Sequence, residues 1–428
     1  MVARESFGSR FSIIGAAIGM AVGTGNIWRF PQVAAEFGGG TFLFALTIAV
    51  FVWAVPLLMA EFYMGYKTRL GNLASFRDFT GKKYTWMGGW LAFCTLGIAF
   101  YYSVVTGWSL RYLAYSFSGT LSSDVDAMGL WNSFTTDPSQ TILFHLIAVI
   151  LAILIIYKGI KSIERAISVL LPSLFVVIII LAIRALTLPG AFDGIHHLFV
   201  PDWPQLLNRR VWLKAFTQAA WSTGAGWGVL MIYAVYSREK EDIGRNSFII
   251  GFADVLAGFF AGTAVVATVY ATAPTVTKAE SFIAEGGTGL TFIYMTELLT
   301  EMPGGSILTP VFFLALSAAN ELSDMKIGPW WSWLIRLFPV MFTVLFGWWV
   351  YQSIGWYPET WWHPFKVEST GTMFFQWGIV AIIMYLLNDL LAENLVKGPL
   401  TKKANIESTN KDTQPIKGEK STVYTKSS

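Results

Sequence analysis

Two apolar segments of the chain contain residues that interrupt helices. Residues 19–31 read Gly-Met-Ala-Val-Gly-Thr-Gly-Asn-Ile-Trp-Arg-Phe-Pro, and residues 222–228 read Ser-Thr-Gly-Ala-Gly-Trp-Gly. Glycine and proline are the poorest helix formers. Backbone groups that a break frees inside a membrane must be satisfied by protein, by an ion or by a water-filled cavity. The two segments therefore predict binding sites to which the backbone contributes.

A single carboxylate lies inside a third apolar segment. Asp254 is the only charged residue between Phe248 and Tyr270, and it lies about two helical turns inside that run. Ionisable side chains inside membrane segments are rare and usually functional. The alternative is a carboxylate that faces water near a helix end. We treat Asp254 as a candidate functional residue.

Other chemistries find little support in the sequence. Cys94 is the only cysteine, which excludes an intramolecular disulfide and a multi-cysteine metal site. The four histidines are scattered, and the chain has no phosphate-binding loop, nucleophile elbow or zinc motif. A dinucleotide fingerprint is rejected for residues 19–31 because no strand precedes them. The sequence predicts a protein that is not an enzyme and has no organic cofactor.

The composition predicts a membrane protein. Of the 428 residues, 54% are hydrophobic and 13% are charged, about half of the usual charged share of ~25%. So few charges do not cover the surface of a soluble globule. The net charge is only +3 and the basic excess lies in the Lys-rich segment 397–428, so no basic face for nucleic acid is indicated.

Ten apolar stretches are long enough to cross a bilayer. They lie at residues 12–35, 42–66, 86–117, 141–157, 166–188, 212–236, 247–272, 305–326, 330–354 and 372–392. The loops 67–83, 158–165 and 238–245 are rich in Lys and Arg, whereas 118–139 contains neither. Because basic loops stay in the cytoplasm, we expect a multi-pass protein of the plasma (cell inner) membrane with both termini cytoplasmic.

The two breaks fall in the first and sixth of these ten stretches. They hold matching positions if the chain consists of two five-helix halves, which then have opposite orientations. Paired interrupted helices indicate the binding site of an inverted-repeat secondary transporter. Glycine-mediated helix packing is the alternative. It accounts for Gly15 and Gly19 but not for Asn26, Arg29 and Pro31 in the same helix.

Several motifs resemble one family of membrane proteins. They are GNIWRFPQVAAEFGGGTF (25–42), PLLMAEFYMG (56–65), YY (101–102), KGIKSIERA (158–166), PDW (201–203) and QAAWSTGAGWG (218–228). In this order they resemble the neurotransmitter:sodium symporter family, in its prokaryotic branch, over residues 4–325. The resemblance implies an all-α polytopic fold of about ten transmembrane helices in a 5+5 inverted repeat, with helices 1 and 6 broken.

This resemblance also implies a division of the chain. The expected parts are a cytoplasmic N-terminal latch (1–11), a first repeat (12–188), an outer loop (189–211), a second repeat (212–396, with outer loop 273–303) and a disordered cytoplasmic tail (397–428). The tail is rich in Lys, Ser and Thr and nearly lacks large apolar side chains.

Two sodium sites with oxygen ligands follow from the resemblance. The first would consist of the Ala21 carbonyl and the side chains of Asn26, Ser222 and Asp254. The second would use carbonyls of helices 1 and 8 and two side chains of helix 8, with the register of helix 8 open by one residue. Its expected members are Gly19, Val22, Ala319 or Asn320, Ser323 and Asp324.

The resemblance implies three groups of contacts to an amino-acid substrate. The amides of Thr24 and Gly25 and the hydroxyl of Tyr102 would bind the substrate carboxylate. Carbonyls of helices 1 and 6 would bind its amine, namely those of Ala21, Trp221, Ser222 and Gly224. Apolar side chains would line the pocket, namely Val22, Ile98, Trp221 and Trp227. A bulky indole at position 227 favours small neutral amino acids, with larger ones left open.

The gates follow from the resemblance in part. Arg29 matches the arginine of the outer gate and Gln218 its partner on helix 6. The acidic partner on helix 10 has no match, because residues 371–377 carry no carboxylate and Glu368 is only the nearest. For the inner side, Arg4 and Phe7 match the latch and Tyr236 its helix-6 contact. Glu61 matches a helix-2 carboxylate that satisfies amides of the broken helix 6.

We therefore expect sodium-coupled symport of a neutral amino acid by alternating access. Asp254 adds a fixed negative charge beside the sodium sites, so chloride independence is expected. The alternatives are an amino-acid exchanger, a proton-coupled member, or a sensor that binds amino acids without transporting them. The sequence does not indicate the particular amino acid, the sodium stoichiometry or the oligomeric state.

Overall fold

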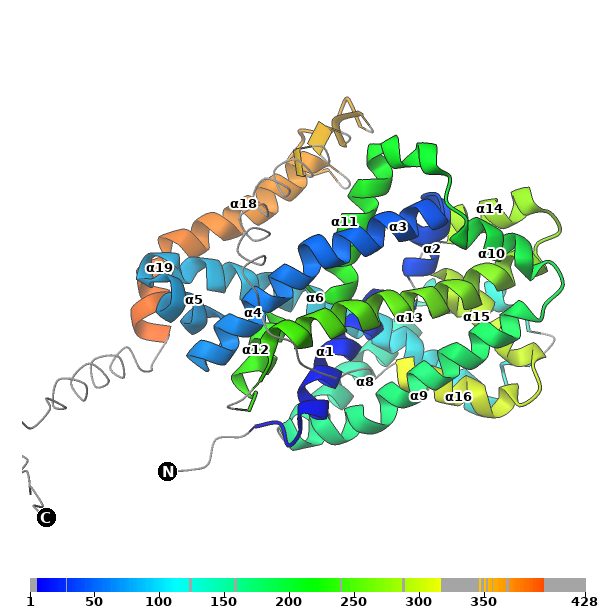
Figure 1. Ribbon diagram of the computed structural model, residues 1–428, viewed down its shortest axis with the longest axis horizontal. Coiled ribbons are helices and arrows are strands. Elements are labelled where there is room, and N and C mark those ends of the chain that lie inside the picture. The colour runs from blue at the N-terminus through cyan, green and yellow to red at the C-terminus, as the bar shows by residue number, and fades with distance from the viewer. Residues whose placement is uncertain are drawn as a thin grey trace, which may run out of the picture.

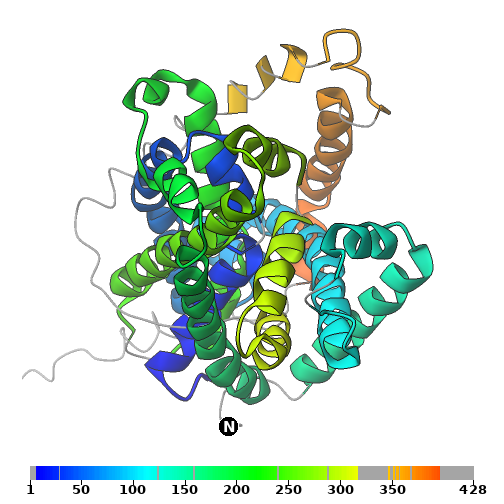
Figure 2. The same ribbon diagram turned by 90° about the vertical axis from the view of Figure 1, so that its right-hand side faces the viewer.

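A computed structural model describes the chain at residues 6–27, 29–122, 125–157, 160–238, 241–286, 289–316, 346–347, 350–351, 353–355, 357–366 and 369–395. These residues are mostly helical, and the helices pack side by side in one bundle (Figures 1 and 2). Within the described residues there is no β-strand, and one isolated antiparallel bridge joins Gly39 to Pro201.

The helices of the first half follow the apolar stretches of the sequence. They are α1 (Arg10–Gly25), α2 (Phe30–Glu36), α3 (Gly40–Ala49), η1 (Val50–Ala54), α4 (Val55–Thr68), α5 (Asn72–Thr80), η2 (Lys82–Tyr84), α6 (Thr85–Ser118), α7 (Ala127–Thr135), α8 (Pro138–Tyr157), α9 (Ile160–Leu186) and α10 (Ala191–Phe199). Helices α3, η1 and α4 run on as one segment, and its central turn η1 is a π-helix.

The described helices of the second half begin with the short helix η3. They are η3 (Trp203–Leu207), α11 (Arg209–Thr223), α12 (Val229–Val235), α13 (Ile243–Thr272), α14 (Val276–Gly286), α15 (Leu290–Glu301), α16 (Gly305–Leu316), α18 (Thr370–Leu386), α19 (Asn388–Leu390) and η5 (Leu391–Leu395). Most of the ninth expected span lies outside the described residues, and so does the end of the eighth.

Three described helices are long and apolar enough to cross a membrane. They are Gly40–Thr68, Lys82–Ser118 and Ile243–Thr272. Two bent pairs also qualify, Ala127–Thr135 with Pro138–Leu154 and Leu171–Leu186 with Ala191–Phe199. The apolar helices Gly305–Leu316 and Thr370–Leu386 are shorter. The count of ten spans remains a prediction.

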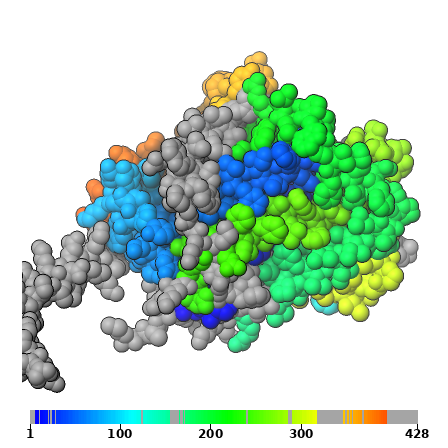
Figure 3. Space-filling model, viewed as in Figure 1, coloured from blue at the N-terminus to red at the C-terminus, as the bar shows by residue number. Residues whose placement is uncertain are grey.

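Apolar side chains on several helices point out of the bundle. Ile142 on α8 is 67% exposed, Val169 on α9 is 62% exposed and Phe100 on α6 is 63% exposed. A large exposed apolar surface marks contact with a partner or a membrane. On the face drawn in Figure 3, part of α3 reaches the surface beside α11, and its Phe44 is 43% exposed.

Helix α13 lies at the centre of the bundle and packs against α1, α2, α4, α9 and α10 (Figure 1). Small residues permit this close packing. An added Cβ would lie 3.1 Å from the Phe30 ring at Gly258 and 2.9 Å from it at Gly262. The half-helix α2 is thereby packed against α13, which carries Asp254.

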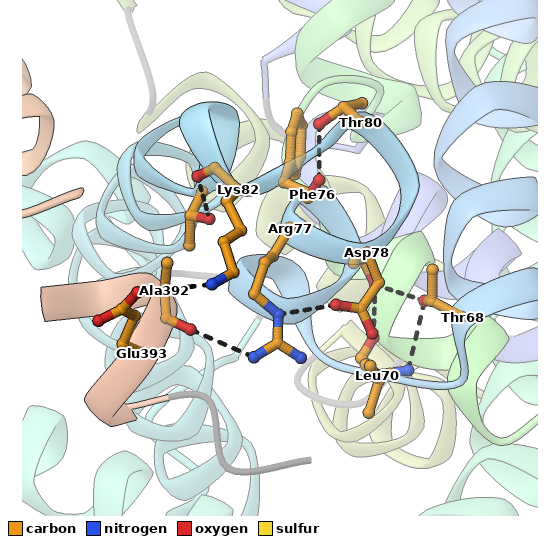
Figure 4. A network of polar contacts seen from close by, with 11 residues as sticks. Thr68, Leu70, Phe76, Arg77, Asp78, Thr80, Lys82, Ala392 and Glu393 are labelled. Carbon is orange, nitrogen blue, oxygen red and sulfur yellow. Dashed lines mark hydrogen bonds and ion pairs between the residues drawn. The ribbon is translucent and has the colours of Figure 1, made fainter. Parts of the chain in front are cut away.

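Polar contacts join α5 to the end of the α18 segment (Figure 4). The buried Arg77 pairs with Asp78 (Nε to Oδ1, 2.7 Å) and donates from Nη1 to the carbonyl of Ala392 at 3.2 Å. Lys82 reaches Glu393 at 3.4 Å. These contacts hold η5 against α5 and η2.

Candidate functional site

The first break separates α1 from α2. Helix α1 ends at Gly25, and α2 begins at Phe30 with Pro31 in its first turn, where no backbone donor is needed. Asn26 keeps helical dihedral angles (φ −77°, ψ −27°), and the amide of Arg29 donates to the carbonyl of Gly25 at 3.2 Å. The carbonyl of Ile27 accepts from the Thr291 hydroxyl of α15 at 2.6 Å.

The second break separates α11 from α12 and has a different geometry. Gly224, Gly226 and Gly228 have φ angles of 66°, 88° and 72°, a left-handed region that favours glycine. The buried carboxylate of Glu61 on α4 accepts from the amide of Gly226 at 2.6 Å and from that of Gly228 at 3.0 Å. The resemblance predicted that Glu61 accepts hydrogen bonds from amides of this interrupted segment.

Three polar side chains meet between the breaks. The Asn26 amide group donates to Asp254 Oδ1 at 2.7 Å and to the Asp254 carbonyl at 3.0 Å. The Ser222 hydroxyl donates to Asp254 Oδ2 at 2.8 Å. All three residues are buried, with 1% exposure or less. The structure thus brings together residues that lie 32 and 228 positions from Asp254 in the sequence.

This cluster offers oxygen atoms from a carboxylate, a hydroxyl and an amide. Such ligands suit a hard cation. Within the described residues no group of three or more His, Cys, Asp or Glu side chains could hold a metal ion, so a transition-metal site is not indicated there. The donor set fits sodium, and Ala21 is also buried on α1, four residues before its last residue.

Aromatic rings lie beside the cluster. The centroid of Tyr102 is 6.2 Å from that of Trp221 and 5.9 Å from that of Trp227, and the two indoles are 5.7 Å apart. Gly25 lies against this group, because an added Cβ would come within 2.8 Å of Trp221 Cδ1. Ile98 is half-buried one turn before Tyr102 on α6. Val22 is fully buried, and the Thr24 side chain lies outside the described residues.

The residues of the expected outer gate lie beside these rings. Arg29 donates from Nη1 to Gln218 Oε1, and its guanidinium lies 5.4 Å from the centroid of the Trp221 ring. Helix α18 carries no Asp or Glu between residues 370 and 386. Glu368 lies outside the described residues.

At the end of the bundle expected to face the cytoplasm, Phe7 contacts α12 and the residue that follows it. Its amide donates to the carbonyl of Tyr236 at 3.0 Å, and its ring meets Tyr233 edge-on at a centroid distance of 6.4 Å. Gly19 of the expected second sodium site is buried in α1. The expected members of that site on the eighth span lie outside the described residues, namely Ala319, Asn320, Ser323 and Asp324. Arg4 of the expected latch lies outside them as well.

Two threonines contact the breaks, and the sequence did not indicate either of them as a site residue. Thr291 contacts the first break, as described above, and the Thr95 hydroxyl of α6 donates to the carbonyl of Trp227 in the second. Both are ordinary threonines in apolar helices. No spacing or motif in one sequence shows which distant carbonyl such a hydroxyl reaches.

These features define a class of protein. A polytopic all-helical membrane protein with polar groups gathered at two interrupted helices has the architecture of a secondary transporter. A sequence model of the sodium:neurotransmitter symporter family matches residues 4–136 and 136–328. The chain belongs to this family, which consists of sodium-dependent transporters and not of enzymes.

Known relatives are similar over most of the chain. An uncharacterized sodium-dependent transporter of Methanocaldococcus jannaschii is 35% identical over 76% of this chain and 68% of its own length. Another from Bacillus subtilis is 30% identical over 75% and 71%. The sodium-dependent serotonin transporter of Drosophila melanogaster is 28% identical over 73% of this chain and 56% of its own length.

A solved structure has the same fold. The crystal structure of MhsT in complex with L-phenylalanine matches with a TM-score of 0.67 at 26% identity. The match covers 93% of this chain and 84% of MhsT.

Proposed function

We propose that this chain imports a small neutral amino acid together with sodium across the plasma membrane by alternating access. Membership of the family supports sodium-coupled symport, and the L-phenylalanine bound to MhsT supports a neutral amino acid as the substrate. The small size of the substrate rests on the buried indole of Trp227. The observation that carries the proposal is the convergence of Asn26, Ser222 and Asp254 beside the aromatic group of Tyr102, Trp221 and Trp227.

The roles of the residues follow from their positions. The side chains of Asn26, Ser222 and Asp254, with the Ala21 carbonyl, would hold the first sodium ion. The carboxylate of Asp254 accepts hydrogen bonds from the other two side chains. The backbone at Thr24 and Gly25 lies at the end of α1, and Tyr102 faces the same region, so the substrate carboxylate would bind between them.

Further ligands belong to the same proposal. The carbonyls of Trp221, Ser222 and Gly224 would bind the substrate amine. The Gly224 carbonyl already accepts from the Trp227 amide at 3.1 Å, which leaves one lone pair of that oxygen for a substrate. A second sodium ion would use the carbonyls of Gly19 and Val22 together with the expected residues of helix 8.

The close packing of the aromatic rings supports small substrates. Ring centroids 4.5–7 Å apart, as here, place aromatic side chains in direct contact. Trp227 is only 8% exposed, so its indole occupies the space beside Tyr102. Ile98 and Val22 would complete the apolar wall.

Chloride independence is part of the proposal. Two cations and a substrate in a buried site need a compensating negative charge. Asp254 supplies a fixed one next to Asn26 and Ser222. Uptake should therefore be equal in chloride and gluconate. Asp254→Asn should abolish uptake or make it respond to chloride, and loss of wild-type uptake in gluconate would contradict this part.

Transport in proteoliposomes tests the function. We expect labelled alanine or glycine to accumulate when sodium is placed outside, and not when potassium replaces it. Accumulation driven by a proton gradient without sodium would indicate a proton-coupled member. Counterflow without net accumulation would indicate an exchanger, and binding without flux would indicate a sensor. Each of these three results would contradict sodium-coupled uptake.

A further inference from the structure

Thr95 contacts the second break, between α11 and α12, from a third helix. It lies half-buried on α6, and the single hydrogen of its hydroxyl is shared between the Trp227 carbonyl and, at 2.8 Å, the Leu91 carbonyl of its own helix. The second contact is the usual one for a helical threonine. The first joins residues 132 positions apart in the sequence. None of the roles described above includes Thr95.

The contact completes the hydrogen bonding of the Trp227 backbone. The Trp227 amide donates to the Gly224 carbonyl at 3.1 Å, and Glu61 holds the amides of the residues on either side. Gly226 and Gly228 are both in the left-handed region, where glycine leaves the backbone free to rotate. The Thr95 hydroxyl therefore restrains a carbonyl between two conformationally free residues.

The carbonyl and the indole both belong to Trp227, so the position of this carbonyl affects where the indole lies in the proposed pocket. The Trp227 ring meets Tyr102 at 5.9 Å and Trp221 at 5.7 Å. Thr95 and Tyr102 lie seven residues apart on α6, about two turns, and so share a face of that helix. The Thr95 hydroxyl thus links the helix that carries Tyr102 directly to the backbone that carries Trp227.

We propose that Thr95 is a positioning residue that sets the size limit of the substrate pocket through Trp227. The inference rests on the proposed function, because it assumes that Trp227 lines the pocket. Valine has the shape of threonine without the hydroxyl, so Thr95→Val releases the carbonyl with little change in packing. Serine keeps the hydroxyl, so Thr95→Ser should keep the contact.

Uptake of alanine and of leucine by five variants tests the proposal. Losing this part-buried hydrogen bond should lower the preference for alanine over leucine, measured as a ratio of kcat/KM values, by about 3- to 10-fold in Thr95→Val. Thr95→Ser should stay within about 2-fold of wild type.

Thr47→Val is the matched control, because Thr47 is also half-buried and its hydroxyl bonds the Leu43 carbonyl at 2.8 Å. In a Trp227→Leu background, Thr95→Val should cause no further change in the ratio.

Two results would overturn the proposal. One is an alanine-to-leucine ratio in Thr95→Val equal to that of wild type. The other is an equal fall in uptake of both amino acids in Thr95→Val and Thr95→Ser, which shows a packing role. If Thr95→Val does not reach the membrane, Thr95→Ala against Thr95→Ser makes the same comparison.

The proposed function can fail separately. Competition between alanine and leucine for binding to purified protein gives the same preference without transport. Wild-type protein that binds amino acids but does not accumulate them with sodium would contradict the proposed function. The binding ratio of Thr95→Val to wild type would then still decide the role of Thr95.

Discussion

The two helix breaks are built differently. In the first, Asn26 keeps helical angles and a hydrogen bond from Arg29 to Gly25 spans the gap between α1 and α2. In the second, three glycines in the left-handed region turn the chain away from the helical path between α11 and α12. The first break is a local irregularity, and the second is a true loop inside the bundle.

This difference assigns different tasks to the two breaks. The first contributes side chains, since Asn26 contacts Asp254 and Arg29 contacts Gln218. The second exposes backbone, and other helices must satisfy it through Glu61 and Thr95. We therefore expect substitutions at the first break to affect ion and substrate binding, and substitutions around the second to affect folding as well.

The largest expected effect is at Glu61. In Glu61→Gln a neutral amide replaces a carboxylate that accepts two backbone hydrogen bonds. The NH₂ group of the glutamine would then face the backbone N–H of Gly226 or Gly228, which is also a donor. Bonds to charged groups contribute about 1.5–3 kcal/mol each, so the free energy of unfolding should fall by about 3 kcal/mol. Thermal unfolding in detergent measures this. Glu359→Gln, at an exposed carboxylate, is the control and should unfold like wild type. Equal melting temperatures for the two variants would show that the second break does not need Glu61.

The next effect is at Asn26. Asn26→Ala removes one proposed sodium ligand and should weaken sodium binding by about 10-fold or more, roughly 1.5–3 kcal/mol for a contact to a charge. Substrate affinity should fall in parallel because the two sites are adjacent. Binding of labelled substrate against sodium concentration measures both. Unchanged sodium dependence with normal substrate affinity would show that the first break does not supply a ligand.

A smaller effect is expected at Thr291, which contacts the first break from α15. Thr291→Val leaves the buried Ile27 carbonyl without this donor and should reduce stability by about 1 kcal/mol. Thr296→Val is the matched control, since Thr296 is buried on the same helix and its hydroxyl bonds only the Phe292 carbonyl. Hydrogen exchange of residues 290–301 should become faster in Thr291→Val than in the control. Equal exchange would place the support of the first break elsewhere.

The smallest effect is a pH dependence at Glu297, also on α15 in the expected outer loop 273–303. Burial, reinforced by the charges of Glu301 and Asp126, raises the pKa of Glu297 to about 7. A carboxyl with a raised pKa stabilises the folded state below its ordinary pKa, and this contribution is lost as pH rises through 7. Protection factors for α15 should therefore be lower at pH 8 than at pH 5.5. Glu297→Gln should reduce that difference, and an unchanged difference would assign it to other groups.

The sequence alone located both breaks, since glycine, asparagine and proline act on the backbone where they stand. It also indicated a membrane protein, because too few charged residues are present to cover a soluble surface. The family followed from motifs in a fixed order, and the family model confirms it. The proposed sodium ligands Asn26, Ser222 and Asp254 were expected from motif position, and the structure brings Asn26 and Ser222 within hydrogen-bond distance of Asp254.

Only the tertiary structure decided how each break is satisfied. The Thr291 hydroxyl bonds a carbonyl 264 residues away, and the Thr95 hydroxyl bonds one 132 residues away. A threonine in an apolar helix usually bonds its own helix, and nothing local distinguishes these two from Thr47 or Thr296. Which helix faces which is set by packing of the whole bundle, so contacts of this kind follow from the folded chain and not from the spacing of its residues.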